Sequence, residues 1–95
     1  MNSRTTDRFR RALGRLPGPI QARARRAYRL FLSDPSHSSL RFKLVHEKRP
    51  IYSVRIGLGY RALGVRDRDE IIWFWIGSHA DYDLLLRDLA RLTGP

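Results

Sequence analysis

The sequence predicts one α+β domain with an N-terminal helical hairpin, a four-stranded antiparallel sheet and a C-terminal helix. Three observations predict it: apolar residues recur at helical spacing up to Leu32, alternate with polar residues from Leu40 to Ile76, and return to helical spacing from Tyr82. The 95 residues suit a single hydrophobic core, so one domain over residues 1–95 is expected. A hydrophobic content of 42% argues against a disordered chain.

Two helices are expected at the start, and no strand before them. The first, from about Arg8 to Leu16, has an apolar stripe at Phe9, Ala12, Leu13 and Leu16. Thr6 or Asp7 can cap its beginning. Pro17-Gly18-Pro19 ends it, because proline and glycine interrupt helices, and a second helix follows from about Pro19 to Leu32.

The middle of the chain predicts four strands joined by short turns. Their expected ranges are Leu40–Val45, Ile51–Gly57, Tyr60–Arg66 and Glu70–Ile76, with Glu47-Lys48-Arg49-Pro50 as the first turn. Short connections favour an antiparallel meander. The last strand is apolar throughout, which favours a central position.

Trp73 and Trp75 are two residues apart in that last strand, so the alternation predicts that they share one face of the sheet. Exposed, the two rings could stack on nucleic-acid bases. Core packing is the preferred alternative. The C-terminal helix then buries Tyr82, Leu85, Leu86 and Leu89, with Ser78 as its cap and Asp81 three residues on, and Gly94-Pro95 ends it.

Charge is the strongest global feature of the chain. Lys plus Arg number 19 against 9 Asp plus Glu, for a formal net charge of +10, and 17 of the 19 cations are Arg. Such a surface attracts polyanions, and the planar guanidinium grips phosphate oxygens in pairs. Nucleic acid, an anionic membrane surface and an acidic protein are the partner classes that charge alone leaves open.

Two further features limit the function classes. The longest apolar run, Ile71–Ile76, is too short to span a bilayer. There is no cysteine, which excludes disulfides and thiolate metal sites and suits the reducing cytoplasm, where we expect the protein to act. Phosphate-loop, Gly-x-Ser-x-Gly and His-Glu-x-x-His motifs are missing, and the three histidines are scattered, so no cofactor or metal is expected.

His79 is the histidine that the pattern singles out. It lies where the last strand enters the last helix, and the positive end of the helix dipole there favours a neutral imidazole able to accept a proton. Tyr82 and Asp83 follow at helical spacings of three and four residues, within reach of the same place. The alternative is a capping or packing histidine without catalytic role.

Strand cations are the next candidates. Arg55 lies on the strand face opposite Tyr52, Val54 and Ile56, and Arg61 follows the Gly57-Leu58-Gly59 turn. Both, like Lys43, can alternatively be exposed charges that discourage edge pairing. Alternation alone does not place the three on one face, because a bulge near Gly59 would reset it.

Several segments together resemble the RelE/ParE superfamily of type II toxin–antitoxin toxins, in particular the branch with a Gly-Ser-His-x-x-Tyr ending. The similarity covers roughly residues 9–90 and consists, in order, of Leu16-Pro17, the stretch from Asp34 to Lys43, Tyr52-Ser53-Val54-Arg55, Tyr60-Arg61-Ala62-Leu63 and the stretch from Trp73 to Asp83. One departure is that many relatives begin with a strand, whereas this chain is expected to open with its helical hairpin.

The resemblance implies a microbial-RNase-like fold, with helices on one face of the sheet and a concave basic face opposite. It also implies a metal-independent endoribonuclease that cuts mRNA on the ribosome, where the 2′-hydroxyl attacks the adjacent phosphate with help from cations, a base and an acid. The corresponding catalytic residues are Arg55, Arg61, His79 and Tyr82, with Lys43 and Arg41 as RNA-binding cations.

The resemblance implies partners as well: a small antitoxin in a toxin–antitoxin hetero-oligomer, and mRNA on the ribosome, without a membrane. Two alternative functions stay open. The ParE branch inhibits DNA gyrase instead of cutting RNA, and a toxin-like domain can also act as a non-catalytic RNA- or protein-binding module.

Overall fold

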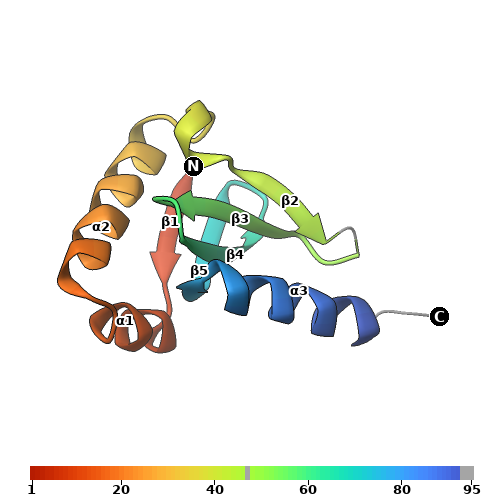
Figure 1. Cartoon of the computed structure of the whole chain (residues 1–95). Coiled ribbons are helices and arrows are strands. Elements are labelled where there is room, and N and C mark those ends of the chain that lie inside the picture. Colours follow the sequence, from red (N-terminus) through yellow and green to blue (C-terminus); the bar gives the residue numbers. More distant parts are fainter. Residues whose placement is uncertain (47, 93–95) are drawn as a thin grey trace.

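The computed structural model describes residues 1–46 and 48–92, so Glu47 of the predicted first turn and the predicted Gly94-Pro95 stop lie outside the described residues. The described elements form a five-stranded sheet in the order β1-β5-β4-β3-β2, with helices on both sides (Figure 1). In chain order they are β1 Asn2–Thr5, α1 Asp7–Gly14, α2 Gly18–Ser33, the 3₁₀ turn η1 Ser38–Leu40, β2 Lys43–His46, β3 Ile51–Ile56, β4 Tyr60–Asp67, β5 Glu70–Ser78 and α3 His79–Leu92.

The α+β class, the helical hairpin, the antiparallel β2–β5 meander and the C-terminal helix are confirmed. The expectation of four strands with no strand before the hairpin is wrong. β1 pairs in parallel with β5, from Asn2 opposite Glu70 to Thr5 opposite Trp73. Its four residues are polar and show no apolar alternation, so their pairing depends on the open edge of β5 and not on a local pattern.

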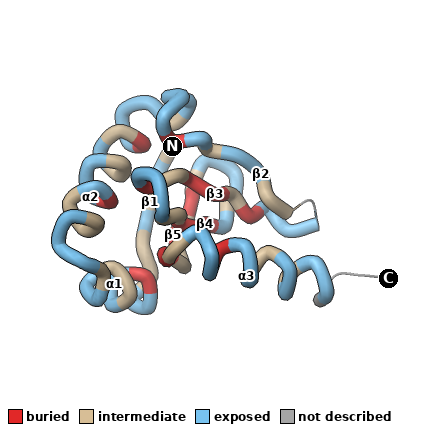
Figure 2. Tube along the Cα trace, viewed as in Figure 1, coloured by how far each residue is buried: buried red, intermediate tan, exposed pale blue. Residues whose placement is uncertain are grey.

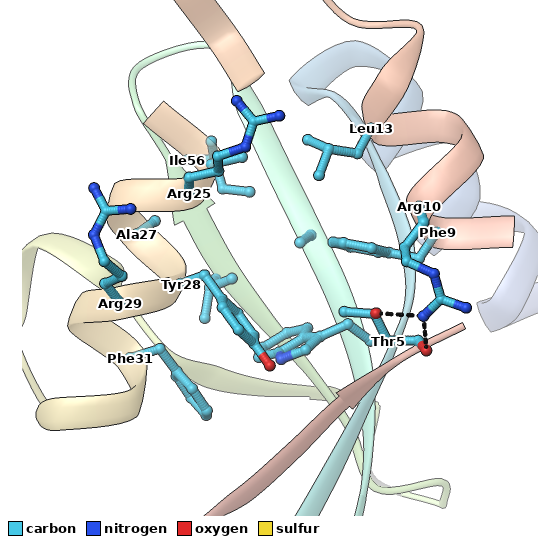
Figure 3. Close-up of a pocket in the computed structure, with 14 residues that line it drawn as sticks. Thr5, Phe9, Arg10, Leu13, Arg25, Ala27, Tyr28, Arg29, Phe31 and Ile56 are labelled. Carbon is cyan, nitrogen blue, oxygen red and sulfur yellow. Dashed lines mark hydrogen bonds between the residues drawn. The ribbon is translucent and has the colours of Figure 1, made fainter. Parts of the chain in front are cut away.

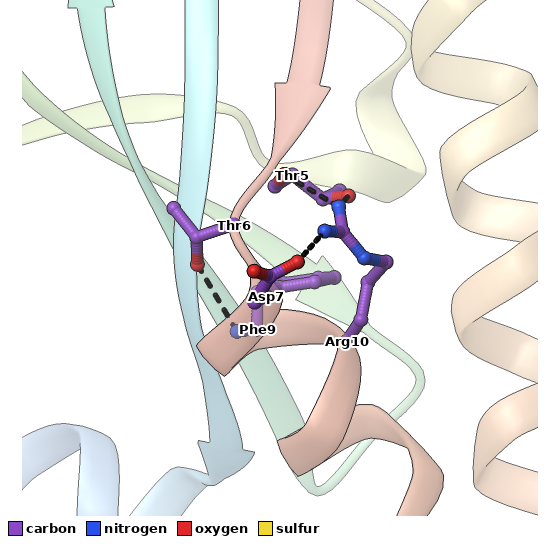
Figure 4. A network of polar contacts seen from close by, with 5 residues as sticks. All are labelled: Thr5, Thr6, Asp7, Phe9 and Arg10. Atoms are coloured by element: carbon purple, nitrogen blue, oxygen red, sulfur yellow. Dashed lines mark hydrogen bonds and ion pairs between the residues drawn. The ribbon is translucent and has the colours of Figure 1, made fainter.

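The first helix of the hairpin, α1, is capped by Thr6, one of the two predicted capping residues. Thr6 precedes α1, and its Oγ1 accepts a hydrogen bond of 3.1 Å from the backbone N–H of Phe9. The Arg10 guanidinium pairs with Asp7 in the first turn and also donates to the Thr5 carbonyl and hydroxyl (Figure 4). Pro17 then lies just before α2, where its missing N–H costs no hydrogen bond.

Each face of the sheet carries its own apolar cluster. On one face α1 contacts β5 and α2 contacts β3, and Phe9 and Phe31 pack with Val54, Ala62 and Trp73. On the other face α3 covers β4 and β5, where Tyr82 packs with Ile51 and Leu63. Buried positions therefore gather in β3, β4 and β5 (Figure 2). The expectation that all helices share one face does not hold, because α3 lies on the second.

A bulge in β5 separates the two tryptophans. Trp73 lies opposite Gly64 and Trp75 lies opposite Leu63, which leaves Phe74 as an extra residue in the pairing with β4. Trp73 is 2% exposed in the α1/α2 cluster, whereas Trp75 packs in the α3 cluster. The prediction that they share one face is wrong, because the bulge resets the alternation. No described helix has the length and hydropathy needed to cross a membrane.

Candidate functional site

The strand register places the predicted cations on the face that α3 covers. Arg55 lies directly opposite Arg61, and Lys43 lies directly opposite Ser53. Residues that face each other across a strand pair share a side of the sheet, as do residues two apart in one strand. The turn between β3 and β4 introduces no bulge, since Ile56 also pairs with Tyr60. The backbone positions of Arg55, Arg61 and Lys43 therefore lie on one face of the sheet.

Arg61 is held by a buried hydroxyl and an aromatic ring. Its Nη1 donates a hydrogen bond of 3.2 Å to Ser53 Oγ, and its Cζ lies 5.4 Å from the centre of the Tyr82 ring. Ser53 is completely buried, and the Tyr82 hydroxyl donates to the same Oγ at 3.4 Å. A guanidinium so placed keeps its remaining N–H groups for an external anion.

Ser53 is the residue that sequence reasoning missed. It is the one buried polar side chain found among the described residues, and it joins Arg61 of β4 to Tyr82 of α3. The sequence did contain a signal for it. Ser53 is a small hydroxyl residue in a strand whose other buried positions are apolar, among them Ile51 and Val54. A buried hydroxyl needs a hydrogen-bond partner, and here it has two.

Tyr82 is enclosed, with 3% of its surface exposed. Its ring stacks on the His79 imidazole with centroids 5.7 Å apart and planes inclined by 23°, and it also contacts Arg61. The structure thus brings Arg61, Tyr82 and His79 together. The Tyr82 hydroxyl donates to Ser53 Oγ, while the ring contacts His79 and Arg61.

His79 is exposed at the first residue of α3, the strand–helix junction that the sequence predicted. Its backbone N–H donates to the Gly59 carbonyl at 2.8 Å, which ties the junction to the β3–β4 turn. Its Nε2 lies 3.7 Å from Asp83 Oδ2, and Ser78 Oγ accepts from the N–H of Asp81, so Ser78 acts as the predicted cap. The imidazole is accessible to a substrate and anchored through its backbone.

Trp75 adds an aromatic surface beside Arg61. A Cβ on Gly77 would lie 2.7 Å from Trp75 Cζ2, so the indole lies directly over Gly77, and Gly77 pairs with Arg61 across the sheet. Trp75 is half-buried. A partly exposed indole next to a guanidinium is a combination able to stack on a base while the cation holds phosphate.

The side chains of the remaining predicted cations do not contact the cluster of Arg61, Tyr82 and His79 in any interaction found among the described residues. Arg55 directs its Nε to the Gly57 carbonyl, 3.1 Å away, and lines a hollow beside α2. Arg41 has a left-handed backbone with φ of 45° and lines a different hollow together with Arg66. Lys43 is exposed at the start of β2, opposite Ser53. In residues 1–46 and 48–92, no group of three or more His, Asp or Glu side chains is arranged to hold a metal ion.

A separate apolar groove lies between the helical hairpin and the sheet. It has a volume of about 270 Å³, and Phe9 and Leu13 of α1 and Tyr28 of α2 line it above the sheet (Figure 3). The side chains of Arg25 and Arg29 also line the groove, at its opening. The groove is therefore apolar within and positively charged around its opening.

Fold and site together define a small basic α+β protein with an arginine, a histidine and an aromatic cluster on the side of the sheet that α3 covers. Residues 19–83 match the family model of the ParE-like toxin domain, and the chain belongs to that family, within the RelE/ParE toxins of type II toxin–antitoxin systems. No curated protein sequence matches the chain.

Solved structures with the same fold include two toxin–antitoxin complexes and YafQ. The chain is similar to a RelB–RelE antitoxin–toxin complex from Methanococcus jannaschii, with a TM-score of 0.67, 22% identity and coverage of 84% of this chain and 95% of that one. The toxin–antitoxin complex RelBE2 from Mycobacterium tuberculosis gives a TM-score of 0.58 at 29% identity, covering 84% and 92%. YafQ from Escherichia coli gives a TM-score of 0.64 at 8% identity, and the match covers 85% of this chain and 96% of YafQ.

Proposed function

We propose that this toxin is a metal-independent endoribonuclease that cuts mRNA on the ribosome in the cytoplasm. The observation that carries the proposal is the contact set of Arg61, whose guanidinium is fixed by Ser53 and Tyr82 beside the accessible imidazole of His79. Cleavage by an internal 2′-hydroxyl needs a base for that hydroxyl and a cation for the charged phosphorus centre.

The proposed step assigns those two tasks to His79 and Arg61. The imidazole removes the 2′-hydroxyl proton, the 2′ oxygen bonds to phosphorus, and the bond to the 5′ oxygen breaks as that oxygen takes a proton from solvent. The products are a 2′,3′-cyclic phosphate and a 5′-hydroxyl. Arg61 neutralises the non-bridging oxygens, Trp75 stacks on a neighbouring base, and the exposed cations Lys43 and Arg41 bind other phosphates of the RNA.

The test is a reconstituted translation reaction in which cut sites on the mRNA are mapped. Wild-type protein is compared with His79→Ala and Arg61→Ala, and with Arg87→Ala as a matched surface control. Ribosome-dependent cuts by wild type and control, lost in the two site variants, support the proposal. Absence of cuts with wild type rejects it, and unchanged cutting by both site variants rejects the residue assignment.

A second candidate is inhibition of DNA gyrase, which the match to a ParE-like domain favours. Under that function the imidazole has no proton to move, so His79→Ala would keep its toxicity and RNA would stay intact. A supercoiling assay with purified gyrase, run beside the translation reaction, separates the two functions.

The proposed partner is a small antitoxin protein, in line with the antitoxin-bound relatives. An acidic amphipathic segment fits the groove between the hairpin and the sheet, because the lining is apolar and the border carries Arg25 and Arg29. Leu13→Glu would put a carboxylate into that lining and is expected to weaken the toxin–antitoxin complex, measured by calorimetry with the protein encoded next to the toxin.

A further inference from the structure

Three arginines from two elements line one surface hollow away from Arg61. Arg23 and Arg26 come from α2 and Arg55 from β3, and the hollow measures about 470 Å³. β2 begins at Lys43, opposite Ser53, so Arg55 lies beyond the end of the neighbouring strand. The open strand edge lets the Arg55 side chain extend toward α2.

Gly57 brings two of these guanidinium groups together. Its φ of +64° and missing side chain allow Arg23 to lie over it, since a Cβ there would be 3.1 Å from Arg23 Cδ and 3.4 Å from Nη1. Arg55 Nε donates to the carbonyl of the same glycine at 3.1 Å. Two positively charged side chains thus contact one residue, Gly57.

The described lining of the hollow offers no acidic side chain to offset these charges. None of the described residues that line it is Asp or Glu, and none of the ion pairs found in residues 1–46 and 48–92 involves Arg23, Arg26 or Arg55. Like charges held close together repel each other, and a bound anion removes the repulsion. Guanidinium groups from two directions match the several oxygens of a phosphate.

We propose that Arg23, Arg26 and Arg55 form a second phosphate-binding site, which holds the RNA backbone beside the cleavage site. Arg55 lies directly opposite Arg61 in the sheet, so this site and the proposed cleavage site adjoin at paired strand positions. Only the choice of RNA as the polyanion rests on the proposed function. The site accounts for the position of Arg55, whose Nε donates to the Gly57 carbonyl within this hollow.

The test measures binding of a fluorescent single-stranded oligoribonucleotide to the purified protein by anisotropy over a range of KCl concentrations. The double variant Arg23→Gln/Arg26→Gln is compared with Arg8→Gln/Arg11→Gln, which removes the same charge from exposed positions of α1. Each lost phosphate contact lowers the slope of log affinity against log salt by about 0.7 for single strands. The first variant is expected to lose about 1.4 of that slope and the control much less.

Further arms separate the possible results. Arg23→Lys/Arg26→Lys keeps the charge and should recover most of the slope, and thermal melting checks that every variant folds. Equal losses in the two Gln variants overturn the proposal, as does absence of RNA binding by wild type. Unchanged RNA binding with impaired antitoxin binding also overturns it and assigns the hollow to an acidic protein. Binding without any ribosome-dependent cleavage leaves this site standing while the proposed function fails.

Discussion

The guanidinium of Arg61 lies 5.4 Å from the centre of the Tyr82 ring, and both side chains direct hydrogen-bond donors to Ser53 Oγ. This triangle joins β3, β4 and α3, three elements that are separate in the sequence. It makes the orientation of the candidate phosphate-binding arginine depend on the docking of the last helix. The following predictions separate positioning from chemistry within that triangle.

Tyr82→Phe is expected to retain most cleavage activity and to lose about 1 kcal/mol of unfolding free energy, because the ring stays and only a long hydrogen bond is lost. Tyr82→Ala is expected to lose about 3–5 kcal/mol, because it leaves a cavity beneath α3. Urea unfolding and cleavage mapping measure both effects. A well-folded Tyr82→Phe protein without cleavage would instead assign the hydroxyl to the reaction.

Ser53→Ala is expected to reduce cleavage roughly tenfold, since Arg61 loses the acceptor that orients it in a charge-stabilising role. It should also destabilise the fold by about 1–2 kcal/mol, because the Tyr82 hydroxyl is left buried without an acceptor. Adding Tyr82→Phe removes that second donor and should recover part of the stability but not the activity. If activity returns together with stability, Ser53 acts only through the fold.

His79→Ala is expected to reduce ribosome-dependent cleavage by about 10²–10⁴-fold, the usual effect of losing a general base. Melting temperature should hardly change, because the imidazole is exposed and the backbone bond to Gly59 remains. Asp83→Asn is the matched control, since it removes only the weak pairing at 3.7 Å. An equal loss of cleavage in both variants would contradict a specific role of the imidazole and assign the effect to the N-terminus of α3 as a whole.

Gly64→Ala tests the bulge that separates Trp73 from Trp75. A Cβ there would lie 2.8 Å from both Ile71 Cγ1 and Trp73 Cε3, in the packed core, so we expect a loss of about 1–3 kcal/mol of unfolding free energy. Gly14→Ala at the end of α1 meets nothing within 4 Å and should stay within about 0.5 kcal/mol of wild type. Similar stabilities for the two variants would contradict this packing.

The sequence by itself determined the α+β class, the helical hairpin, the antiparallel meander and the capped C-terminal helix, because each depends on local periodicity and on residues such as Thr6 and Ser78. It also determined the strand face of Arg55 and the junction position of His79. Periodicity is a property of neighbouring residues, and these features need nothing more.

Only the tertiary structure decided which residues meet. β1 exists because the edge of β5 offers hydrogen bonds, which four polar residues cannot signal on their own. The bulge at Phe74 reset the alternation that had placed Trp73 with Trp75. Ser53 gained its role from the docking of α3, and Arg55 and Arg23 come together at Gly57 although they are 32 positions apart in the sequence. Contacts between distant segments depend on register and strand ends, which local pattern does not encode.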